Sequence, residues 1–214
     1  MGVLASGRGS NFQSIINSID NNTLDAAIAV LITDNPSAYA IERAKSRNIE
    51  HLVLHPAKYG SRDEFYEEIS RELRSRAVDL VVLAGFMRIV GKPLIDAFAN
   101  KIMNIHPALL PSFPGLHGQR QAVEYGVKIS GCTVHFVDEG MDTGPIIIQA
   151  AVPVYDGDTE ESLSERILAL EHRIYPEAIR LFAEGSLEVH GRIVKIRTNA
   201  VQRSFIANPL PRDS

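Results

Sequence analysis

The sequence predicts an α/β fold with a doubly wound, mostly parallel sheet and an antiparallel C-terminal portion. In residues 1–100, apolar strand-like runs alternate with segments whose apolar residues recur at helical spacing. Residues 80–84 are apolar at every position, which is typical of a central parallel strand covered on both faces. Residues 130–137 alternate in polarity and precede an extended apolar run at 145–154, which predicts an antiparallel pair.

The elements of the first half follow from spacing and turn residues. A strand at 1–5 leads into a helix at 11–22, whose apolar residues fall on one face. Ser61 and Glu64 have the spacing of a capping box, so we expect a further helix to begin there. The remaining expected elements of this half are strands at 26–32, 51–54 and 80–84 and a helix at 38–47.

The second half is expected to be less regular. A strand at 102–105 ends before Pro107, which has no backbone donor for a sheet. Asp158 is expected to cap a long helix, with Glu161 in the reciprocal capping position. That helix buries an apolar stripe and ends near Gly185. The last predicted elements form a small hairpin at 187–190 and 192–196.

Composition limits the class of protein. With 214 residues and 45% hydrophobic content, the chain is long enough for one large domain. It has no apolar run of membrane-spanning length and no cationic leader before an apolar stretch, so we expect a cytoplasmic protein without a membrane partner. The lone Cys132 excludes an internal disulfide and a cysteine-based metal site. The net charge of -4 argues against a nucleic-acid partner.

Basic residues gather in the C-terminal tail, where Asp213 is the acidic counterweight. We expect a solvated basic extension there rather than a binding arm. The cations of this tail are Arg192, Lys195, Arg197, Arg203 and Arg212.

The end of the predicted strand 102–105 carries the strongest sign of chemistry. Asn104 and His106 are two residues apart, so on a strand they share one face and can converge on one small reacting group. Asp142 adds a carboxylate from a later loop, and an amide, an imidazole and a carboxylate together indicate an enzyme. Turn chemistry at a strand end is the alternative for Asn104 and His106, and capping of its own turn is the alternative for Asp142.

The loop Ser6-Gly7-Arg8-Gly9-Ser10-Asn11 connects the first predicted strand to the first predicted helix. Its amides and the positive end of the helix dipole can hold a phosphate, and Arg8 adds local charge. The pattern is neither the dinucleotide GxGxxG nor GxxxxGK[ST], so neither a nicotinamide nor a nucleoside triphosphate is indicated. A helix cap is the alternative for such a Gly-Ser-Asn turn.

Four motifs occur in order along the chain: Ser6-Gly7-Arg8-Gly9-Ser10-Asn11, Leu83-Ala84-Gly85-Phe86-Met87-Arg88, Asn104-Ile105-His106-Pro107 with Leu109-Leu110-Pro111, and Asp142-Thr143-Gly144-Pro145. Together they closely resemble the folate-dependent glycinamide ribonucleotide transformylases, from about Gly2 to His190. The resemblance implies a formyltransferase-like fold and, as cosubstrate, 10-formyltetrahydrofolate. It implies transfer of the formyl group to the glycyl amine of glycinamide ribonucleotide in de novo purine biosynthesis, by direct attack through a tetrahedral intermediate and without a metal.

The same resemblance assigns roles to single residues. The catalytic trio would be Asn104, His106 and Asp142, and the carboxylate of Glu171 would meet the substrate. The substrate phosphate would bind at Gly9, Ser10 and Asn11. Folate would bind at Arg62, Met87, Arg88, Ile89, Val90 and Asn104 and at the loop Asp138, Glu139, Gly140 and Met141.

The resemblance further implies one formyltransferase domain over residues 1–214. Its parts would be a phosphate-binding half at 1–100, a catalytic and folate-loop half at 101–190 and a C-terminal extension at 191–214. The expected partners are the two small-molecule substrates, with no nucleic acid and no membrane, and a homodimer is left open.

Three rival functions must explain the same residues. A formyltetrahydrofolate deformylase would share the trio, but it has no use for a phosphate loop and commonly carries an additional N-terminal regulatory domain. A methionyl-tRNA formyltransferase typically adds an RNA-binding domain, and the acidic balance disfavours tRNA. A non-enzymatic phosphometabolite-binding module would need the loop but would leave the trio unused.

Single positions have alternatives of their own. Arg88 could be a surface cation, Arg62 part of a capping segment and Met87 ordinary packing. Glu171 could be a solvated helix charge. The remaining expectations are a core position for Cys132 and structural or exposed positions for His117, His135, His172 and His190.

Overall fold

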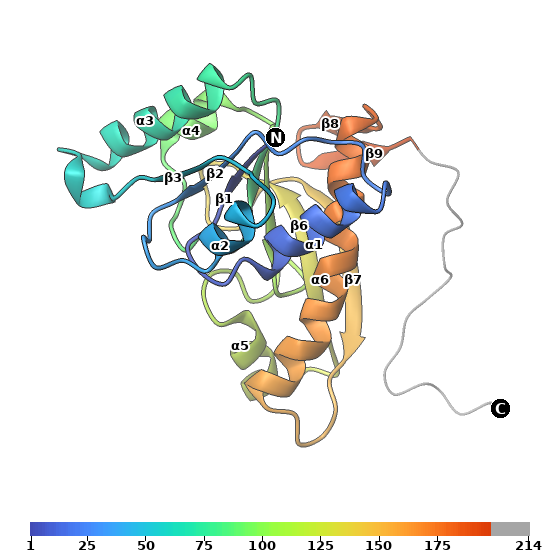
Figure 1. Cartoon of the computed structure of the whole chain (residues 1–214). Helices are drawn as coiled ribbons and strands as arrows, with labels where there is room; N and C mark the ends of the chain where they lie inside the picture. Colours follow the sequence, from blue (N-terminus) through green and yellow to red (C-terminus); the bar gives the residue numbers. More distant parts are fainter. Residues whose placement is uncertain (198–214) are drawn as a thin grey trace.

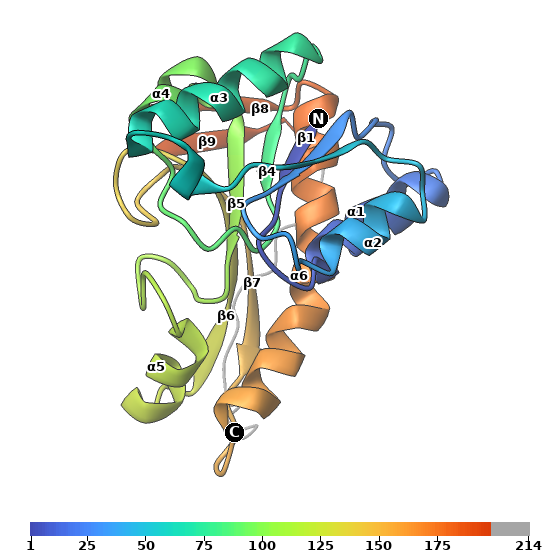
Figure 2. The same cartoon turned by 60° about the vertical axis from the view of Figure 1, so that its left-hand side comes forward.

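The computed structural model describes residues 1–197, which form a nine-stranded sheet with helices on both faces (Figures 1 and 2). The strands are β1 (Gly2–Leu4), β2 (Val30–Thr33), β3 (His51–Val53), β4 (Val81–Leu83), β5 (Ile102–His106), β6 (Ile129–Phe136), β7 (Ile146–Pro153), β8 (Leu187–His190) and β9 (Ile193–Ile196). The helices are α1 (Ser10–Asp20), α2 (Ala40–Lys45), the 3-10 turn η1 (Pro56–Lys58), α3 (Arg62–Ser75), α4 (Lys92–Ala97), α5 (Gly118–Tyr125) and α6 (Glu160–Ala183).

The strand order of the sheet is β3-β2-β1-β4-β5-β6-β7-β9-β8. The first five strands are mutually parallel, and the chain leaves β1 toward β2 and later returns to the other side of β1 with β4. The strand order therefore switches between β1 and β4. β6 runs antiparallel to both β5 and β7, and β8 pairs with β9 as an antiparallel hairpin. The predicted fold class is confirmed.

Two helical layers cover the sheet, as Figure 2 shows. α1, α2 and α6 pack on one face around residues such as Phe12 and Tyr175, which are fully buried. α3 and α4 cover the other face around Tyr66 and Leu94. α5 and the first turns of α6 close a smaller apolar cluster over β6 and β7. Apolar strands buried on both faces, as predicted for residues 80–84, are explained by this sandwich.

One helix start is as predicted and one is wrong. The Ser61 side chain accepts a hydrogen bond from the Glu64 backbone and caps α3. α6, however, is capped by Thr159 with Ser162 as the reciprocal residue, so the expected pair of Asp158 and Glu161 lies one position too early. Asp158 instead forms an ion pair with Arg166, with an N–O distance of 2.8 Å.

Other boundaries differ for reasons of pairing. Residues 26–29 were expected to begin a strand, but β2 begins at Val30 because its neighbour β1 begins at Gly2, the register partner of Val30. No sequence pattern predicted η1, α4 or α5, which are all short. The hairpin of β8 and β9 is confirmed, and β9 joins the main sheet beside β7. Of the basic tail, Arg203 and Arg212 lie outside the described residues.

Candidate active site

The candidate site lies at the carboxyl ends of β1, β4 and β5, where the strand order switches and open α/β sheets bind ligands. The loops after β1 and β4 contact each other, because the Ser6 amide donates to the Gly85 carbonyl at 3.0 Å and Ser6 Oγ accepts from the Met87 amide at 3.1 Å. Leu83 at the end of β4 is the register partner of Asn104. The predicted phosphate loop, folate segment and catalytic strand therefore share one edge.

His106 lies between two hydrogen-bond acceptors. The residue is 4% exposed, and its Nε2 lies 2.8 Å from the Phe113 carbonyl oxygen. Nδ1 lies 3.4 Å from Asp142 Oδ2. Both neighbours accept hydrogen bonds and neither donates, so the surroundings suit a ring that carries protons on both nitrogens. The structure thus brings His106 and Asp142 together from positions 36 residues apart in the numbering.

Asp142 does not cap its own turn. Its backbone is left-handed, with φ of 54°, and its carboxylate accepts a hydrogen bond from the Gly115 amide at 2.8 Å across to another loop. The residue that closes the turn is Asp138, whose Oδ1 accepts from the Gly140 amide at 3.1 Å and from Thr143 Oγ1 at 2.6 Å. The local-capping alternative for Asp142 is therefore wrong, and it applies to Asp138.

His135 was expected to be a structural or exposed histidine, but it is part of the same cluster. It is the register partner of Asn104 across β5 and β6, and its Nε2 lies 3.2 Å from Asn104 Nδ2. The same Nε2 lies 3.7 Å from Asp142 Oδ1. The sequence could have indicated this position of His135, because the alternation of residues 130–137 puts it on the strand face opposite Cys132 and Phe136.

The loop before α1 has the form of an anion site. Gly9 has φ of 66°, a conformation that glycine adopts freely, and α1 has no side-chain cap for its first amides. A Cβ at Gly9 would lie 2.9 Å from Ala40 Cβ, so α2 packs directly against this turn. Arg43 of α2 holds the loop by donating from Nε to the Arg8 carbonyl at 2.8 Å. Gly9 is the N-cap residue of α1, so the turn does cap the helix, but it does so without a side chain. The start of α1 follows β1 at the switch in strand order.

Glu171 is buried rather than solvated. It is 7% exposed on α6, and its Oε2 accepts a hydrogen bond from Asn11 Nδ2 at 2.7 Å. Burial raises the pKa of Glu171, and the Asn11 hydrogen bond opposes that rise. Asn11 Oδ1 is buried without a protein partner. A polar pair with unused acceptor capacity therefore lies beside the phosphate loop.

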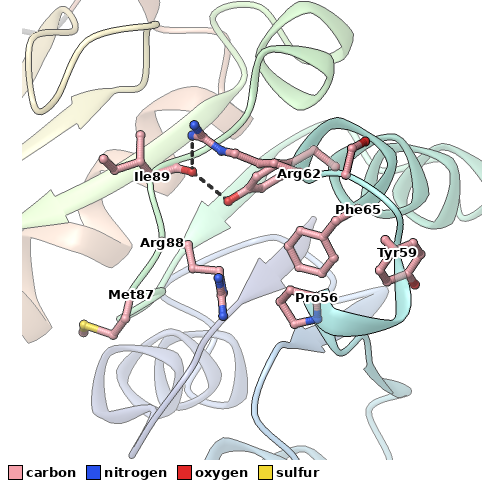
Figure 3. A pocket seen from close by; sticks show the side chains of 9 residues that line it. Pro56, Tyr59, Arg62, Phe65, Met87, Arg88 and Ile89 are labelled. Carbon is pink, nitrogen blue, oxygen red and sulfur yellow. Dashed lines mark hydrogen bonds between the residues drawn. The ribbon is translucent and has the colours of Figure 1, made fainter.

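A pocket of about 550 Å³ brings together four of the predicted folate residues, Arg62, Met87, Arg88 and Ile89 (Figure 3). Arg62 supports the pocket wall, since its Nη2 donates to the carbonyls of Ile89 at 2.7 Å and Val90 at 3.2 Å. Arg88 Nε lies 2.5 Å from Asp34 Oδ2. Arg62 does lie in the capping segment, as the first residue of α3 after Ser61, and Arg88 is a surface cation that pairs with Asp34.

The remaining predicted folate residues are placed differently. The side chain of Val90 is buried in the apolar layer under α3, so only its carbonyl takes part in the wall. Glu139 is exposed and pairs with Lys92 of α4 at 2.7 Å. Met141 is half exposed beside Gly115. The loop 138–141 thus carries one apolar side chain that is free to contact a ligand.

Cys132, His117 and His190 lie where the sequence predicted them. Cys132 is fully buried, and burial raises the pKa of its thiol to about 12, so it is a core residue as predicted. His117 and His190 are exposed, as expected.

Within residues 1–197, no group of three or more metal-ligating side chains is placed to hold a metal ion. No helix in the same range is long and apolar enough to cross a membrane.

The fold and the site define an α/β protein in which an amide, a buried imidazole and a partly buried carboxylate lie on the same sheet edge as the loop before α1. The sequence profile of the formyl transferases matches residues 1–179. The chain therefore belongs to the formyl transferase family.

Named relatives agree with this membership. The chain is 46% identical over 178 residues to the phosphoribosylglycinamide formyltransferase of Bacillus subtilis, an alignment that covers 83% of this chain and 91% of the relative. It is 44% identical to part of the trifunctional purine biosynthetic protein adenosine-3 of Drosophila melanogaster, covering 86% of this chain but 14% of that protein. The crystal structure of glycinamide ribonucleotide transformylase 1 from Symbiobacterium toebii superimposes with a TM-score of 0.90 at 55% identity, covering 91% of this chain and 92% of that chain.

Proposed function

We propose that this chain is a phosphoribosylglycinamide formyltransferase, which transfers the formyl group of 10-formyltetrahydrofolate to the glycyl amine of glycinamide ribonucleotide in de novo purine biosynthesis. The observation that carries the proposal is the contact of His106 with Asp142, at 3.4 Å, on the sheet edge shared with Asn104 and the phosphate loop. Family membership and the similar relatives support the same reaction.

The proposed chemistry is electrostatic. The neutral amine attacks the formyl carbon and creates an oxyanion and an ammonium. The ammonium loses a proton, which Asp142 relays through water. Protonated His106 gives a proton to the folate nitrogen, which leaves as a neutral amine as the carbonyl re-forms and the old C–N bond breaks. Asn104 Nδ2 donates a hydrogen bond to the oxyanion, and protonated His106 donates a second from Nε2 in place of its bond to the Phe113 carbonyl. Asp142 faces the other ring nitrogen and favours the charged ring. No covalent nucleophile takes part, in keeping with the buried thiol of Cys132.

The ribonucleotide is bound from the first half of the sheet. Its phosphate meets the free amides at the start of α1, at Gly9, Ser10 and Asn11, with Arg8 supplying positive charge. The buried carboxylate of Glu171 meets the amine or ribose groups. The pair of Glu171 and Asn11 links these two contacts, since their hydrogen bond is 2.7 Å long.

Formyl-folate is bound from the other side of the strand switch. Its carboxylates meet the guanidinium groups of Arg62 and Arg88, through N–H groups other than those bonded to Ile89, Val90 and Asp34. Met87 and Ile89 offer exposed apolar surface to the ring system. Asp138, Glu139, Gly140 and Met141 form the neighbouring loop. Catalysis without a metal and a cytoplasmic location remain part of the proposal, and a homodimer is left open.

A formyl-transfer assay with and without glycinamide ribonucleotide tests this function. Product should form only when the ribonucleotide is present, and Asn104→Ala should reduce the rate by roughly 10²-fold, the lower range for loss of one oxyanion donor. Glu124→Gln, at an exposed position on α5, is the control and should keep full activity. Release of formate at the same rate without ribonucleotide would identify a hydrolase instead. Formylation of methionyl-tRNA would equally overturn the proposal.

A further inference from the structure

His135 has no role in the reaction as proposed so far, yet its ring lies against the amide of Asn104. It is 2% exposed on β6, and its Nε2 is 3.2 Å from Asn104 Nδ2 on β5. The two residues are register partners, so the strand pairing itself holds the side chains opposite each other. The contact therefore belongs to the rigid part of the fold.

The second ring nitrogen decides what Nε2 can do. His135 Nδ1 lies 2.8 Å from the Phe136 carbonyl oxygen. A carbonyl only accepts hydrogen bonds, so Nδ1 must carry a proton. In the neutral ring Nε2 then has a lone pair and no proton. Asn104 Nδ2 must be the donor in the 3.2 Å contact.

The surroundings favour the neutral ring. Burial lowers the pKa of His135, and the nearby His106 lowers it further. The Phe136 hydrogen bond and the carboxylates of Asp142 and Asp138 oppose this effect. Asp142 Oδ1 is 3.7 Å from Nε2, which is too far for a hydrogen bond that would demand a second proton on the ring.

The neutral ring selects one of the two orientations of the Asn104 amide. In the observed orientation, one N–H of Nδ2 donates to His135 and the other is free for a second acceptor. If the amide were turned over, its oxygen would face the Nε2 lone pair, and two acceptors would oppose each other. A ring in this tautomer therefore presents an N–H, and not the carbonyl oxygen, to a reacting group.

We propose that His135 is a positioning residue that holds Asn104 with its amide nitrogen toward the oxyanion of the formyl-transfer step. The proposal rests on the proposed function. It separates His135 from the catalytic trio, because His135 acts only through Asn104. It also explains why a histidine, with a lone pair on one nitrogen and a proton on the other, is buried at this position of β6.

Replacement by phenylalanine and by glutamine tests the role. His135→Phe keeps a planar ring without an acceptor, so the single-turnover rate should fall by about 10- to 10²-fold, at or below the cost of losing an oxyanion donor. The KM values for both substrates should stay within about twofold, since no ground-state contact is removed. His135→Gln supplies an acceptor oxygen and should restore most of the rate. His190→Phe, at an exposed histidine of β8, is the matched control and should change neither rate nor KM.

A double-mutant cycle distinguishes positioning from general damage. In the Asn104→Ala background, His135→Phe should have no further effect on the rate, because the amide it orients is gone. Losses that multiply would overturn the proposal. If His135→Phe does not fold, nitrogen NMR of the His135 ring in the unmodified protein still tests the proposal. Nδ1 should carry a proton and Nε2 should carry none. A proton on Nε2 would also overturn it. Because the NMR test needs no turnover, its failure is distinct from failure of the formyl-transfer assay.

Discussion

Replacing Glu171 by glutamine gives the sharpest test of how the ribonucleotide is held. The substitution removes the charge but keeps an oxygen that can accept the 2.7 Å hydrogen bond from Asn11. A hydrogen bond to a charged group contributes about 1.5 to 3 kcal/mol, and about 1.4 kcal/mol corresponds to tenfold in Kd. We therefore expect the Kd for glycinamide ribonucleotide to rise by roughly 10- to 150-fold. The Kd for formyl-folate should not change.

Although Glu171→Gln should bind the ribonucleotide more weakly, its folded state should be more stable than that of the parent. Burial raises the pKa of Glu171, so the folded state holds its proton to higher pH than the unfolded state. The cost of the ionised, buried carboxyl is therefore absent below the unfolded pKa, grows as the pH rises, and is complete above the folded pKa. Glutamine does not ionise. Glu171→Gln should be more stable than the parent at neutral pH, and the difference should vanish in acid.

Calorimetric titration with each ligand and urea unfolding at neutral and acidic pH measure these two effects. Glu165→Gln, at an exposed position on the same helix, is the control and should leave the Kd values and the unfolding free energy unchanged. Equal losses of affinity for both ligands would refute the assignment of Glu171 to the ribonucleotide. A variant less stable than the parent at neutral pH would refute the argument from burial.

Three further substitutions test other parts of the molecule. Asp142→Asn should lower the single-turnover rate by at least roughly 10²-fold, the lower range for acid-base catalysis, and should leave the thermal stability unchanged. Near-normal turnover would remove Asp142 from the catalytic trio. Arg88→Ala should raise the KM for formyl-folate more than it lowers kcat, because a remote carboxylate contact is uniform binding, and an unchanged KM places Arg88 outside the site. Tyr175→Phe should lower the free energy of unfolding in urea by about 1 to 3 kcal/mol, because the buried hydroxyl donates to the carbonyls of Leu83 and Met103, both at 2.9 Å. The KM values should not change. An unchanged free energy of unfolding would contradict this prediction.

The parts of the fold that follow local rules could be predicted from sequence. The apolar run 80–84 and the hairpin of β8 and β9 were found where periodicity and turn residues indicated them. The start of β2 could not be found in this way, because Ala26–Ala29 are apolar enough for a strand but have no strand beside them. The predicted capping residue of α6 was wrong because Asp158 binds Arg166, eight residues later in the chain. Both errors arise from partners that the local capping and periodicity patterns do not include.

The candidate site shows the same division. Spacing on one strand was enough to place Asn104 and His106 on one face, and the order of strands and helices was enough to expect the phosphate loop at the same edge. The contact of His135 with Asn104 required the register between β5 and β6, which a long connection separates. Register across such a connection is set by packing rather than by a turn, so no local pattern encodes it.

Asp142 and Asp138 show how backbone conformation divides roles between two identical side chains in one loop. Asp138 binds the amide and hydroxyl of its own turn, as a loop aspartate commonly does. Asp142 has φ of 54°, which turns its carboxylate away from that turn toward His106 and the Gly115 amide. Asparagine tolerates this left-handed conformation as aspartate does, and its oxygen can still accept from Gly115. A loss of rate in Asp142→Asn must therefore come from the missing charge beside His106 and not from a rearranged loop.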